Sequence, residues 1–201
     1  MRSAAILAPI PLLLLLLPAC GGKPAQSTAQ VSREPISVRG WIADIDDGSR
    51  EGMYRTVETE AAKRTQSFQA TNVWVDNAPY VSGGVSEAGA FVLLDVPPGK
   101  TAISFSAPGI PSANVIIENV PGNADVLIPG LILRKNGVSI ADTKALQVRI
   151  AGNVGKPTAT GAMAHVAGVA VPITRVPVNA LLDRRDYPTP PGIGVPLATV
   201  R

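Results

Sequence analysis

The chain has 201 residues, of which 46% are hydrophobic and 16% charged, and its formal net charge is +3 at pH 7. Because this charge is small and scattered along the chain, the composition gives no indication of a nucleic-acid partner. The chain has one cysteine, Cys20, and one histidine, His165, so few residues remain for thiol, disulfide or zinc chemistry and stability must come from packing.

The N-terminal segment is apolar and ends at the cysteine. Residues 12–17 are six leucines, and the last of them begins the sequence Leu17-Pro18-Ala19-Cys20. As a helix, residues 4–19 would span about 24 Å, which is short of the roughly 30 Å hydrocarbon core of a bilayer. This pattern argues against the alternative, an uncleaved membrane helix, as do the prolines within it.

The same segment resembles the signal peptide of a bacterial lipoprotein, although the proline before Ala19 departs from the usual box. The resemblance implies that residues 1–19 are removed and that Cys20 carries acyl chains such as palmitate. The membrane would then be a partner of the protein, bound through these acyl chains, because two or more chains anchor a protein stably. By the same resemblance, the residue after the cysteine directs sorting, and Gly21 in place of an aspartate implies that the protein is exported to the outer membrane of the bacterial cell envelope.

Residues 20–35 are small and polar, which is typical of a flexible linker that spans roughly 20 Å. The alternation of Val38, Gly40 and Ile42 predicts a strand over residues 36–44. The turn sequence Asp46-Asp47-Gly48 follows it. Residues 51–68 are charged and carry apolar residues at helical spacing, which favours a short helix or an irregular insertion.

Short strands with turns between them are predicted for the rest of the chain. Their expected ranges are 71–76, 90–96, 101–107, 113–120, 125–128, 131–135, 138–142 and 146–150. Asn136-Gly137 is a strong hairpin signal because both residues tolerate positive φ. The alternation around Phe105 places it in the core together with Phe91 and places Ser104 on the opposite face, where its replacement by alanine should have little effect.

Part of this pattern resembles the carboxypeptidase regulatory-like domain. The resemblance rests on residues 86–99, which read Ser-Glu-Ala-Gly-Ala-Phe-Val-Leu-Leu-Asp-Val-Pro-Pro-Gly, together with the first strand and the segment around Trp74. It covers roughly residues 36–133 and implies an all-β, transthyretin-like Greek-key β-sandwich. The insertion at residues 50–70 is longer than the usual loop of that domain.

The C-terminal third lies outside the family pattern. Residues 137–182 are expected to add edge strands to the sandwich, because Pro172 and Pro177 suit an edge strand better than a central one. A second copy of the domain is the alternative. The predicted β-sandwich domain then covers residues 36–182, and residues 183–201 form a proline-rich tail.

Catalytic and metal sites are not indicated. His165 lies in a Gly/Ala-rich stretch without the motif of a serine hydrolase, so an ordinary loop or strand position explains it better. The run from Asp44 to Gly48 lacks the remaining ligands of a calcium loop and is better explained as a turn. We therefore expect no enzyme activity, no cofactor and no metal. A catalytic carboxylate pair of the glycosidase type remains an alternative, because its two residues can be distant in the sequence and come together only in the folded protein.

The aromatic residues give the clearest indication of a site. Trp41 and Trp74 alternate with the aliphatic residues of their strands, so both should face away from the core, and Tyr80 is a third candidate. Such rings either bind a glycan or an envelope protein, or are covered by the insertion or the C-terminal segment. The predicted function is that of a structural or ligand-binding envelope module. The alternative is a carbohydrate-binding accessory module or a carbohydrate-active enzyme.

The anchor can be tested by replacing Cys20 with serine, which removes the acylated thiol. We expect the variant to leave the membrane fraction, because residues 4–19 are too short and too interrupted to hold the protein as a helix. Cell fractionation with an alkaline wash measures this. A Cys20→Ser protein that stays membrane-bound through the wash would show that the segment is a membrane helix.

Overall fold

The computed structural model describes residues 34–48, 57–152, 158–178 and 181, so the predicted signal peptide, the linker up to residue 33 and the tail lie outside the described residues. All the described residues belong to one compact unit. The elements are β1 (Ile36–Asp46), α1 (Val57–Gln69), β2 (Asn72–Val75), β3 (Ala78–Gly84), β4 (Ala90–Val96), β5 (Gly99–Ala107), β6 (Ile110–Val120), β7 (Ala124–Arg134), β8 (Gly137–Ile140), η1 (Thr143–Ala145), β9 (Gln147–Gly152), β10 (Thr158–Val166) and β11 (Val169–Pro177).

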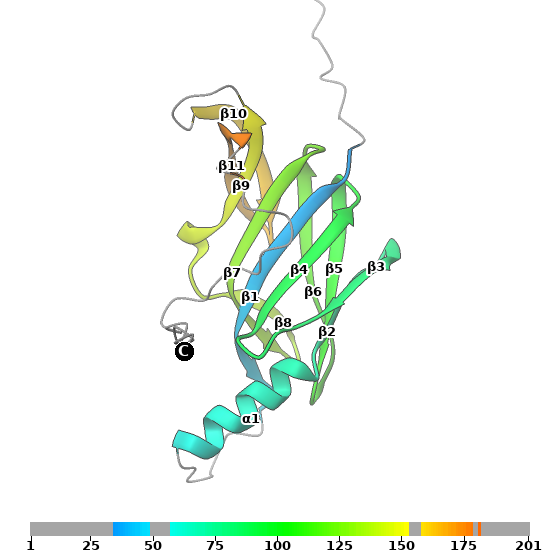
Figure 1. Ribbon diagram of the computed structural model, residues 1–201, viewed down its shortest axis with the longest axis vertical. Helices are drawn as coiled ribbons and strands as arrows, with labels where there is room; N and C mark the ends of the chain where they lie inside the picture. The colour runs from blue at the N-terminus through cyan, green and yellow to red at the C-terminus, as the bar shows by residue number, and fades with distance from the viewer. Residues whose placement is uncertain (1–33, 49–56, 153–157, 179–180, 182–201) are drawn as a thin grey trace, which may run out of the picture. The chain divides into compact units, whose positions relative to one another are not determined.

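All the strands of the described residues belong to one mixed sheet, which is strongly curved (Figure 1). Its order is β3-β2-β5-β6-β10-β11-β9-β7-β1-β4, and β8 pairs with β7 beside this path. The pairs β1/β7 and β9/β11 are parallel. The two end strands approach each other, since a Cβ on Gly83 of β3 would lie 3.5 Å from the Val92 carbonyl oxygen of β4. The sheet therefore nearly closes into a barrel.

The prediction of a transthyretin-like, two-sheet Greek-key sandwich is therefore wrong. The error lies in the C-terminal strands, which were expected at the edge of the sheet. Instead β10, β11 and β9 stand between β6 and β7 and join the two halves into one continuous ladder. Pro172 is accommodated inside the sheet because the ladder from β11 to β9 begins only at Ile173. Alternation within a strand gives its buried face, but it does not give its neighbours.

Other elements follow the predictions more closely. Helix α1 lies within the predicted range 51–68 except for its last residue, and the part of that range before Val57 is outside the described residues. The hairpin of β7 and β8 is present, with Arg134 paired to Gly137, so the turn lies one residue earlier than predicted. Strand β3 is absent from the predicted strands, and β10 falls within the predicted edge region 137–182 without a range of its own, because Gly83 and Gly84 in one and Gly161 in the other resemble turn residues.

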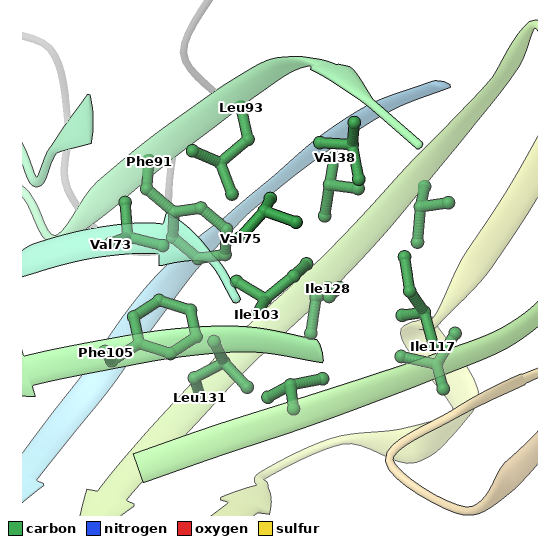
Figure 2. Packing of buried hydrophobic residues seen from close by; sticks show 14 of the residues in the cluster. Val38, Val73, Val75, Phe91, Leu93, Ile103, Phe105, Ile117, Ile128 and Leu131 are labelled. Atoms are coloured by element: carbon green, nitrogen blue, oxygen red, sulfur yellow. The ribbon is translucent and has the colours of Figure 1, made fainter. Parts of the chain in front are cut away.

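The core fills the space enclosed by the curved sheet. Figure 2 shows side chains from β1, β2, β4, β5, β6 and β7 that point toward one another. Phe91 and Phe105, predicted as core residues, are fully buried and meet edge to face with ring centroids 5.2 Å apart. Gly40 makes room for this pair, since a Cβ there would lie 2.9 Å from the Phe91 ring and 2.1 Å from the Ile128 carbonyl oxygen.

A second buried group lies on the opposite face of β1, β7 and β9 and consists of charged side chains. The Asp125 carboxylate of β7 accepts hydrogen bonds from Arg39 Nε of β1 at 2.8 Å and from an Arg149 terminal nitrogen of β9 at 2.7 Å. The Ser37 hydroxyl lies 3.1 Å from the same carboxylate. The side chains of Arg39 and Asp125 are 1% and 5% exposed. One carboxylate thus joins three neighbouring strands.

Replacing Asp125 with alanine should lower the free energy of unfolding by about 3–5 kcal/mol, because it removes the carboxylate that the buried Arg39 and the partly buried Arg149 both bond. The matched control is Asp46→Ala. Asp46 also bonds an arginine Nε, that of Arg134, but both side chains are at least 40% exposed, so the expected cost is about 0–1 kcal/mol. Urea denaturation measures both. Equal costs in the two variants would contradict the structural role of Asp125.

Truncating Phe91 or Phe105 to alanine should cost about 3–5 kcal/mol through lost burial and the cavity that remains. For Ser104 the structure changes the expectation. Ser104 lies on the face opposite the core, but it is only 2% exposed and hydrogen-bonds Asp76 and Asn114. Ser104→Ala should therefore cost about 1 kcal/mol rather than nothing. Thermal or urea melts of the three variants test this order, which small and equal effects would contradict.

Candidate functional site

A cleft of about 650 Å³ lies between α1 and the adjoining end of the sheet. We call it the α1 cleft. Its lining comes from β1, α1, the turn before β4, the middle of β7 and the segment that follows β8. Its volume is within the range of small-molecule sites. Most of its apolar lining is small, with five alanines, one proline and one glycine, and Trp41 and Phe68 are the aromatic residues.

Helix α1 forms one wall and is held by its C-terminal half. Phe68, which is 3% exposed, packs against the turn before β4, where Gly89 has φ +82°. A Cβ on Gly89 would lie 2.6 Å from the Ile42 carbonyl oxygen and 3.1 Å from the Phe68 ring. At the end of the helix, Gln69 Nε2 donates to Glu87 Oε1 at 2.9 Å. The absence of a side chain at residue 89 thus lets the helix lie against the sheet.

An irregularity in the β1/β7 ladder forms the floor. Gly40 pairs with Ile128 and Ile42 pairs with Leu131, so β7 carries one extra residue opposite Trp41. This β-bulge contains Pro129 and Gly130, which line the cleft together with Trp41. Proline has no N–H for the ladder and glycine tolerates the φ of +65° found at residue 130. Pro129 and Gly130 therefore interrupt regular strand pairing at the position that forms the floor of the cleft.

Three charged side chains stand around the cleft. Arg64 of α1 donates to the Ala43 carbonyl oxygen, and its guanidinium carbon lies 5.4 Å from the centre of the Phe68 ring. Glu87 and Asp142 contribute carboxylates from the opposite segments. Asp142 also accepts the Lys144 backbone N–H at 2.9 Å and caps η1. All three side chains belong to exposed residues, so the site combines a small apolar floor with a hydrated polar rim.

The predicted binding residues do not share one surface. Trp41 is half-buried and lines the α1 cleft. Trp74 is also half-buried, but it lies on β2 opposite Ser82 and Ser104 and does not line the cleft. Tyr80 of β3 is 81% exposed and does not line it either. The proposed lipidation residue, Cys20, lies outside the described residues.

The remaining candidates from the sequence are away from the cleft. His165 lies in β10, paired with Glu118 of β6. Lys100 lies 2.9 Å from Glu118, and its hydrogen bond and positive charge lower the pKa of that carboxyl. Asp46 accepts the Gly48 N–H at 3.3 Å, as in a turn. Within the described part of the chain, no three histidine, cysteine or acidic residues are grouped so that they could hold a metal ion.

Compared with known proteins, the chain matches no family model and no curated protein.

Sequence reasoning identifies Trp41 but misses the rest of the cleft. Three signals are present: Pro129-Gly130 between two apolar stretches, Phe68 near the end of a polar helix, and Gly89 after Glu87. Each signal also has a purely local interpretation: Pro129-Gly130 can end a strand, Phe68 can belong to the insertion, and Gly89 can form a turn. None of them shows that these segments meet.

Gly89→Ala should destabilise the protein and disturb α1, because the new methyl group would overlap the Ile42 carbonyl oxygen and press on Phe68. Gly48→Ala is the matched control, since residue 48 has a similar φ of +75° but no atom within 4 Å of the place that its new methyl group would occupy. We expect a cost of about 1 kcal/mol at Gly48 from backbone strain and a clearly larger one at Gly89. Thermal melts measure the difference. Equal costs would show that close packing at Gly89 contributes nothing.

Proposed function

We propose that this protein is a non-enzymatic, lipid-anchored protein of the bacterial cell envelope whose β domain binds a ligand in the α1 cleft. The observation that carries the binding role is the cleft itself, in which an aromatic ring, an apolar floor and a few polar side chains converge. The anchor is supported by the sequence around Cys20, and the outer membrane is the proposed location. Among the described residues, no helix is both long and apolar enough to cross a membrane.

A carbohydrate-active enzyme is the second candidate, because the cleft gathers two carboxylates, Glu87 and Asp142. A glycosidase holds one carboxyl group in an apolar, buried environment, where it acts as the general acid. Both residues are exposed instead, and each already accepts a hydrogen bond from its own structural neighbour. This arrangement favours binding over hydrolysis.

The binding role predicts that blocking the cleft removes ligand capture. Ala61 and Ala62 are both exposed on α1, but only Ala61 lines the cleft. Ala61→Phe should therefore fill part of the cleft, whereas Ala62→Phe should not. The full chain, purified in detergent, is incubated with fractionated envelope extract, and retained molecules are identified by mass spectrometry.

We expect the wild-type protein and Ala62→Phe to retain the same compound and Ala61→Phe to lose it. Circular dichroism checks that both variants fold. Retention of the same compounds by all three proteins would show that the cleft is not the binding site.

A further inference from the structure

We propose that the ligand of the α1 cleft is a neutral carbohydrate chain, of which one or two pyranose units lie against Trp41. This inference rests on the proposed function and names the ligand class of the same site. It is carried by the position of Trp41 over the β7 bulge together with the polar groups that surround it.

Trp41 supplies a flat apolar surface next to a floor that leaves room for a ring. Opposite it, Pro129 and Gly130 carry no long side chain, and the alanines of the cleft extend little beyond the backbone. The C–H groups on one face of a pyranose ring match an indole face, while its hydroxyls remain at the ring edge. A half-buried tryptophan beside small residues therefore provides the stacking surface that a sugar ring needs.

The rim supplies partners for the hydroxyls. Glu87 and Asp142 are acceptors, and the Arg64 guanidinium is a donor with several N–H groups. Vicinal hydroxyls can donate to a carboxylate and accept from a guanidinium, and these charge-assisted bonds are stronger than neutral ones. Since all three residues are exposed, they can reach an entering ligand without a large desolvation cost.

The same groups disfavour other ligand classes. A fatty acyl chain would need long aliphatic side chains around it, but the floor is built mainly of alanine, proline and glycine. An anionic ligand would meet two carboxylates and one guanidinium, and that guanidinium already donates to the Ala43 carbonyl oxygen. Acidic glycans are therefore expected to bind more weakly than neutral ones.

The surface around Trp74 is a weaker carbohydrate site. There Ser104, which hydrogen-bonds both Asp76 and Asn114, is only 2% exposed and cannot reach a ligand. These contacts lie across neighbouring strands of the sheet, and no cleft-lining residue is among them. Trp74 consequently serves as an internal control for Trp41.

The test uses the full chain with Trp74→Phe, in which Trp41 is the only tryptophan, since the sequence contains two. Purified protein in detergent is first screened on an array of neutral and acidic oligosaccharides. Cellotetraose, chitotetraose and the neutral glycan that binds best are then titrated against Trp41 fluorescence. We expect a saturable change in emission with at least one neutral glycan, and weaker binding of uronic-acid chains.

Calorimetric titration with the same glycan then compares single variants of the wild-type chain. Trp41→Ala should weaken binding roughly ten-fold, the scale of one lost aromatic contact, and Trp41→Phe should weaken it less. Glu87→Gln and Asp142→Asn should each weaken it several-fold, and Trp74→Ala should leave it unchanged. Each variant is checked for folding by circular dichroism.

Two results separate the failure of this inference from the failure of the proposed function. If no oligosaccharide binds, while Ala61→Phe still loses an envelope compound that Ala62→Phe retains, the cleft binds a ligand of another class and only the carbohydrate assignment fails. If a neutral glycan binds but is shortened during incubation, as chromatography would show, the carbohydrate assignment holds, the protein is a carbohydrate-active enzyme, and only the non-enzymatic function fails.

Discussion

The carboxylate of Asp125 is the interaction on which the arrangement of the sheet depends. It lies on β7, whose neighbours are β1 on one side and β9 on the other, and it bonds an arginine from each. Arg39 is fully buried, and its hydrogen bond to this carboxylate offsets part of the cost of burying its charge beside β7. The contact also selects neighbours, since a strand without the complementary charge would leave the carboxylate buried and uncompensated. The parallel pairing of β1 with β7 and the position of β9 are therefore coupled through one side chain.

This coupling determines where the α1 cleft lies. With β1 and β7 paired in parallel from Ser37 onward, the extra residue of β7 falls opposite Trp41. Regular register resumes after the bulge, because β1 has one extra residue between Ile42 and Asp44 that compensates for the extra residue of β7. The floor of the cleft is thus an interruption between two regular stretches of ladder. Such a site is held on both sides by hydrogen-bonded strands, which is the rigid support that a binding site requires.

The sequence predicts the strands of this protein better than it predicts their partners. Alternation correctly indicates the buried faces of β1 and β5, since Val38 and Phe105 are fully buried. It does not show that β10, β11 and β9 enter the middle of the sheet, because any apolar strand can pair with any other. It also misjudges the outer face of β1. Arg39, at a position that alternation assigns to solvent, is as buried as Val38, and it forms an ion pair with Asp125, which is 86 residues away in the sequence.

The candidate site is predictable from the sequence only at Trp41. An aromatic ring on the face opposite the aliphatic residues marks Trp41, but it marks Trp74 equally, and sequence alone does not distinguish them. The distinction comes from the segment that contains α1, which places Arg64 and Phe68 beside Trp41 in the cleft lining. Trp74, which is also half-buried, does not line the cleft. The sheet sets the position of the Trp41 ring and α1 makes it part of a cleft, so changes in α1 should alter the shape of this cleft more readily than changes in the strands.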